Sequence, residues 1–96
     1  MLIKAGVDIS RLRPEIRKKL NIIDRIISAV NDEELIITST YEGTHHPSSI
    51  HYAHLAIDIR ARKNIATLKN EIAKTLGNNY FIYQAKTHIH IGYDPK

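Results

Sequence analysis

SIHYAHLAIDIR, residues 49–60, is the stretch that decides the fold. Its second half reads as a strand, in which alternate side chains share a face. His54 and Asp58 fall on one face, and Ile57 and Ile59 fall on the other. The run therefore predicts a strand with a core on one side and polar side chains on the other.

A second run near the end of the chain, THIHIGY at residues 87–93, repeats this alternation. His88 and His90 share one face, and the two isoleucines between and after them share the other. If both runs lie in one sheet with their isoleucines on the core, His90 and Asp58 point to the same side.

His51 lies seven positions before Asp58, an odd number, so on a regular strand the two side chains would face opposite sides. We expect it on the loop just ahead of the strand, or re-aimed by a bulge. Two imidazoles and one carboxylate suit zinc, and a catalytic zinc site keeps a fourth position open. The pattern is compatible with a zinc site at His51, Asp58 and His90. On the residues alone, ordinary surface or core-edge histidines are the more frequent explanation, and no His-Glu-x-x-His helix motif is present.

The rest of the chain predicts an α+β fold. Residues 1–13 read as extended or turn-like, and Pro14 suits the first turn of a helix. The expected order is helix 14–31, strand 35–40, loop 41–50, strand 54–60, helix 64–76 with Asn64 as N-cap and Gly77 ending it, strand 80–84, a hairpin turn at 85–86, and strand 87–93. This order predicts a mainly antiparallel sheet of about four strands. Two helices pack on one face, and the zinc site lies on the other.

The 96 residues predict a single domain, 1–96, with a modest core. There are no cysteines, so His, Asp or Glu must hold any metal. No apolar run reaches the length of a membrane span, and the start of the chain lacks a signal-peptide core, which predicts synthesis in the cytoplasm. The net charge of +4 is interpreted as a solvated helix face. Nucleic acid is not expected as a partner, because aromatic residues are not interleaved with the basic ones.

Several segments together resemble one known family. They are Thr38-Ser39-Thr40-Tyr41, His45, Pro47-Ser48-Ser49-Ile50-His51-Tyr52, Ala56-Ile57-Asp58-Ile59-Arg60, His88-Ile89-His90 and Tyr93-Asp94-Pro95. The chain resembles the zinc D-Ala-D-Ala carboxypeptidases, which include small phage and bacterial peptidoglycan endopeptidases and are similar in fold to the Hedgehog signalling domain. The resemblance covers nearly everything from Leu35 on.

The resemblance implies a zinc metallopeptidase that hydrolyses a peptidoglycan peptide bond with metal-activated water. It assigns the ligands to His51, Asp58 and His90, and places His88 beside the metal as a catalytic assistant. The substrate side falls on Ser49, His45 and His54. Such a protein, made without a signal peptide, would reach the cell wall through phage lysis.

Two departures from the family pattern leave alternatives open. His54 stands where relatives have glycine, and an imidazole there could become a fourth ligand and close the site. Thr87 stands where relatives carry the carboxylate that acts as general base. The alternatives to an active peptidase are therefore a zinc-binding relative without catalysis, which binds the wall or a peptide, and a basic binding module without metal.

Overall fold

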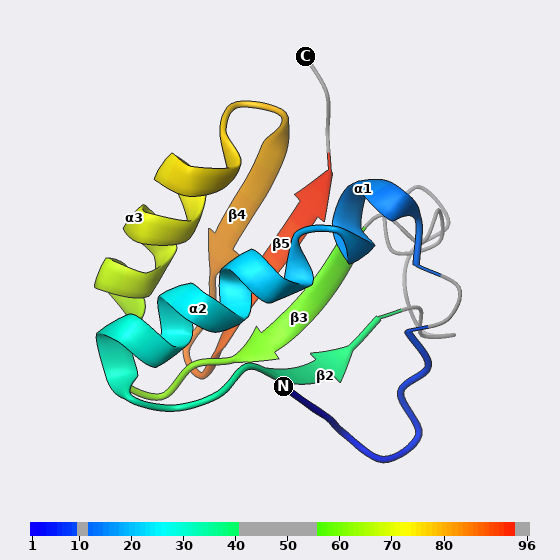
Figure 1. The fold of residues 1–96 in the computed structure, drawn as a ribbon. Helices are drawn as coiled ribbons and strands as arrows, with labels where there is room; N and C mark the ends of the chain where they lie inside the picture. The colour runs from blue at the N-terminus through cyan, green and yellow to red at the C-terminus, as the bar shows by residue number, and fades with distance from the viewer. Residues whose placement is uncertain (10–11, 41–55, 94–96) are drawn as a thin grey trace.

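The computed structural model describes residues 1–9, 12–40 and 56–93. Figure 1 shows their arrangement. In chain order the elements are β1 (Leu2–Ile3), α1 (Pro14–Arg17), α2 (Leu20–Asn31), β2 (Ile36–Ser39), β3 (Ala56–Arg60), α3 (Ile65–Leu76), β4 (Tyr80–Gln84) and β5 (His88–Tyr93). No helix in these ranges is long and apolar enough to cross a membrane.

The sheet in the described part of the chain has the strand order β1-β2-β3-β5-β4. Figure 1 shows α2 and α3 together on one face of it, so the predicted α+β arrangement is confirmed. The predicted four-stranded, mainly antiparallel sheet needs correction. Leu2 pairs with Ile36 in parallel and adds a fifth strand, which makes the sheet mixed. Two residues are too few to show the alternation by which a strand is recognised in sequence.

The centre of the sheet is the antiparallel pair β3–β5, which has a regular register. Ile57 lies opposite Ile91 and Ile59 lies opposite Ile89. All four side chains are fully buried, so the alternation read from the sequence holds in the structure. The residues between them face the opposite side of the sheet.

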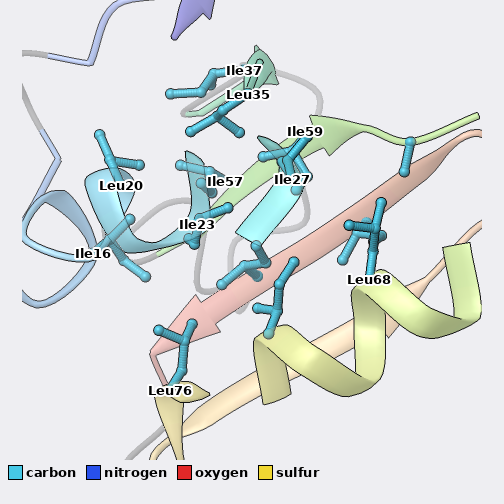
Figure 2. Packing of buried hydrophobic residues seen from close by; sticks show 14 of the residues in the cluster. Ile16, Leu20, Ile23, Ile27, Leu35, Ile37, Ile57, Ile59, Leu68 and Leu76 are labelled. Carbon is cyan, nitrogen blue, oxygen red and sulfur yellow. The ribbon is translucent and has the colours of Figure 1, made fainter. Parts of the chain in front are cut away.

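The core fills the space between this isoleucine face and the helices, as Figure 2 shows. Each helix contributes a stripe of apolar side chains at helical spacing. Burying one such side chain stabilises the fold by about 1.5–3 kcal/mol. The stripe of α2 comprises Leu20, Ile23 and Ile27, and that of α3 comprises Leu68, Ile72 and Leu76.

The predicted helix 14–31 is not continuous, because it is interrupted between α1 and α2. The Lys19 N–H bonds to the carbonyl of Ile16, three residues back, at 3.0 Å. A regular helix would use the carbonyl of Glu15, four residues back. That carbonyl instead accepts a hydrogen bond of 2.6 Å from the Tyr80 hydroxyl. The tight turn thus frees an acceptor that ties the helical segment to β4.

Asn64 occupies the N-cap position of α3 as predicted, but its side chain does not cap the helix. Its backbone is left-handed, and its side chain makes no capping hydrogen bond. The side-chain amide instead donates to the Asn31 side-chain oxygen at 2.8 Å. Asn31 in turn donates to the Lys63 carbonyl at 3.1 Å. Two amide side chains therefore join the end of α2 to the start of α3.

Replacing Asn31, which is 5% exposed, with alanine should therefore destabilise the domain. The change leaves the Lys63 carbonyl and the Asn64 amide without their partner, which costs about 1–3 kcal/mol. The measurement is urea unfolding. Asn21→Ala, an exposed change in the same helix, is the control and should alter stability by less than about 0.5 kcal/mol. Equal stabilities of the two variants would contradict this account.

The environment of Tyr80 predicts that the domain loses stability in alkaline solution. Burial, followed by the neighbouring Tyr93 and Glu15, raises the pKa of Tyr80 above its ordinary value of 10.0. The unfolded chain therefore releases this proton at a lower pH than the folded chain does. The stabilisation is complete below pH 10 and is lost as pH rises through the folded pKa.

Tyr80→Phe removes this ionisation together with the hydrogen bond to Glu15. At neutral pH the variant should be less stable by about 0.5–1.5 kcal/mol. The difference from the parent should shrink as the pH rises above 10 and through the raised pKa of folded Tyr80. Unfolding curves of both proteins at matched pH values measure this difference. A difference that stays constant with pH would show that Tyr80 ionises equally in both states.

Candidate metal and substrate site

The site is built on the face of the sheet opposite the helices, around one pair of residues. Asp58 on β3 lies directly opposite His90 on β5. Asp58 Oδ1 and His90 Nδ1 are 2.8 Å apart, and because a carboxylate only accepts, the ring nitrogen donates. The side chains are 27% and 22% exposed, so the pair is accessible from this face.

The neighbouring strand β2 is shaped so that it borders this pair. Its pairing with β3 slips by one residue, so that Ile37 lies opposite Ile59 and Ser39 lies opposite Asp58. A bulge of this kind bends a strand and re-aims its side chains. Thr38 donates from its hydroxyl to the Asp58 carbonyl at 3.3 Å. The irregularity brings Ser39 next to the carboxylate while Ile37 stays in the core.

Aromatic rings border the pair on the other side. Tyr83 on β4 lies directly opposite His90. Phe81, two residues earlier on the same strand, meets the His90 ring edge-on, with ring centroids 6.1 Å apart. These rings are 57% and 48% exposed, unusually high for large aromatic side chains. They give one side of the site an apolar surface that a ligand could cover.

His88 lies two residues before His90 and faces the same side of the sheet. Its Nδ1 is 2.8 Å from the hydroxyl of Thr87. This contact fixes the imidazole plane and leaves Nε2 as the other polar atom of the ring. Thr87, which holds the place of the carboxylate expected from the family pattern, thus serves as a hydrogen-bond partner of His88.

A hollow of about 430 Å³ lies over these residues. Its described lining combines hydroxyl, carboxylate, imidazole, phenol and ammonium groups. Asp58 is the single carboxylate among them. The lining residues are Lys4, Thr38, Ser39, Asp58, Tyr83, Ala85, His88 and His90.

The Asp58–His90 pair fits two positions of a zinc site. Zinc with bonds of 2.0–2.2 Å in a tetrahedron holds two ligand atoms roughly 3.4 Å apart. The two atoms here, at 2.8 Å, would need to separate by well under 1 Å, and Nδ1 would give up its proton to become a ligand. Oxygen and imidazole nitrogen are also the ligand types that zinc accepts. The described residues thus offer two suitable ligands on an accessible surface.

The remaining predicted site residues, His51, Ser49, His45 and His54, lie outside the described residues. Within residues 1–9, 12–40 and 56–93, no group of three or more His, Cys, Asp or Glu side chains is placed to hold a metal. The structure brings Asp58, His90 and His88 together in the lining of one hollow. The sequence matches no model of a known protein family and no curated protein.

Five residues that line the hollow were not predicted as site residues from the sequence: Lys4, Thr38, Ser39, Tyr83 and Ala85. The alternation of residues 80–84 carried a signal for Tyr83, because Tyr80 and Ile82 point to the core. The side chains between them must then face the site. Lys4 carried no such signal. It reaches the site only because its backbone N–H bonds to the Ile37 carbonyl at 2.9 Å, beside the short strand β1.

Proposed function

We propose that this domain is a zinc-dependent peptidase of the peptidoglycan-hydrolysing type. The observation that carries the proposal is the contact between Asp58 and His90, two residues 32 positions apart in sequence, in an accessible hollow. Their chemistry and their separation suit zinc, and the resemblance of the surrounding motifs supplies the reaction type. Zinc, when bound, lowers the pKa of water and polarises a carbonyl.

In this proposal, each side chain of the site has a distinct role. Asp58, His90 and His51 hold the ion. His88 faces the same hollow, and its ring is fixed by Thr87, so it can donate a hydrogen bond to the oxygen of the scissile carbonyl or take up a proton. Ser49, His45 and His54 contribute to substrate binding, and a wall peptide is the substrate.

Zinc binding provides the first test. The purified protein should bind one zinc per chain, and Asp58→Asn, His90→Ala and His51→Ala should each lose it. His88→Ala is the matched control, since it removes an imidazole from the same strand as His90 and should retain zinc. Elemental analysis measures the metal content. Zinc at 100 times its Kd should also stabilise the parent by about 2.7 kcal/mol. Full zinc in His90→Ala would exclude the proposed ligands.

Hydrolysis provides the second test. The zinc-loaded protein should release peptides from purified peptidoglycan, and a chelator should abolish the release. His88→Ala should keep its zinc and lose about 10²–10³ in rate, the usual cost of removing one group that stabilises the reacting oxygen. The exposed change Lys74→Gln on α3 should leave the rate unchanged. Activity of His88→Ala equal to that of the parent would remove this residue from the mechanism.

One observation favours the second candidate, a zinc-binding domain without catalysis. Asp58 is the single carboxylate in the described lining of the hollow, and in this proposal it is a ligand. A general base typically contributes 10²–10⁴ in rate. One zinc per chain without cleavage of any wall type, across a range of pH, would favour a domain that holds a wall peptide without cutting it.

A further inference from the structure

The hollow runs across the strands. Tyr83, His90, Asp58 and Ser39 are successive cross-strand neighbours on β4, β5, β3 and β2. Lys4 follows β1, beyond β2, and completes the row. A ligand that fills the hollow therefore lies across the sheet, with the Asp58–His90 pair between its two ends.

The two ends of this row differ in chemistry. At the β1 end, the exposed Lys4 carries an ammonium group, and its side chain forms no ion pair with any described residue. At the β4 end, Tyr83 presents a phenol ring that is more than half exposed. The hollow thus has a cationic end and an aromatic end, which favours a ligand that carries negative charge on one side only.

We propose that Lys4 determines substrate specificity by binding a carboxylate of the peptide that occupies the hollow. This inference rests on the proposed function, which supplies the peptide. An ammonium group at the rim of a partly enclosed surface pairs with a carboxylate more strongly than one in open water, because fewer water molecules screen the pair. Lys4 does not touch the reacting atoms and acts on the choice of substrate.

The spacing of the strands places this carboxylate along the substrate. Neighbouring strands are about 4.8 Å apart, so the β1 backbone lies roughly 12 Å from the midpoint of the β3–β5 pair. An extended peptide advances about 3.3–3.6 Å per residue. The carboxylate bound by Lys4 should therefore lie about three or four residues from the cleaved bond. It is not the carboxylate of a single released residue.

Other cations near the site fit this role less well. Arg60 lies opposite His88 on the same face, but it is not part of the lining of the hollow. Lys86, which follows the lining residue Ala85, is not part of the described lining either. Lys4 can also be changed without disturbing the fold, since its structural contacts come from its backbone, through Ile37 and Val7.

The test compares native peptidoglycan with peptidoglycan whose carboxylates have been converted to amides. Two quantities are measured with the zinc-loaded protein: co-sedimentation with the insoluble wall, which needs no cleavage, and release of soluble peptides. The parent should prefer the native wall by roughly two- to fivefold in binding, as expected for a partly exposed ion pair. Lys4→Gln should lose the preference, and Lys4→Arg should keep it.

Two controls remove a positive charge elsewhere. Lys74→Gln lowers the net charge by the same amount on α3, and Arg60→Gln removes the neighbouring cation. Both should keep the preference of the parent. Equal losses in Lys4→Gln and Lys74→Gln would show a general effect of charge and would overturn the proposal. A loss confined to Arg60→Gln would also overturn it.

The two readouts separate this inference from the proposed function. Binding that depends on carboxylates and on Lys4, without cleavage, would support the role of Lys4 and refute the peptidase. Cleavage that is indifferent to amidation would support the peptidase and refute the role of Lys4. Neither binding nor cleavage would refute both. Mass spectrometry of released peptides should place a carboxylate about three or four residues from the new end.

Discussion

The antiparallel pairing of β3 with β5 is the constraint on which the rest of the structure depends. Its register sets Ile57 against Ile91 on one face and Asp58 against His90 on the other. A slip of one residue would exchange the two faces of the moved strand, exposing isoleucines and burying a carboxylate or an imidazole. The apolar core therefore fixes the register, and the register brings the two polar side chains to 2.8 Å.

The core and the site lie on opposite faces of the sheet, but the residues that form them alternate along the same two strands. Ala56 and Gly92, which lie opposite each other next to the Asp58–His90 pair, are the smallest side chains of the two strands. On β4, the rings of Phe81 and Tyr83, two residues apart, lie beside the pair. A mutation on the isoleucine face of these strands should therefore affect the core, and a mutation on the opposite face should affect the site.

Periodicity predicted the parts of this fold that depend on many residues of one kind. The helix stripes, the alternation on both central strands and the shared face of Asp58 and His90 follow from it. Periodicity did not predict the features that depend on a single contact. The break between α1 and α2 depends on a Tyr80 hydroxyl that arrives 65 residues later in the chain. Lys4 lines the hollow through a two-residue parallel strand, and Asn64 bonds across to Asn31. Such partners are distant in sequence and leave no local pattern.

Few ionisable groups line the described part of the hollow, and this limits the chemistry that it can support. A carboxylate that binds metal through one oxygen and contacts a neighbour through the other is a poor proton acceptor, since the metal lowers its basicity. If Asp58 and His90 are ligands, His88 is the remaining imidazole in the described lining. The hydroxyl of Thr87 holds one of its ring nitrogens. Catalysis in the proposed peptidase would thus depend on a single imidazole nitrogen.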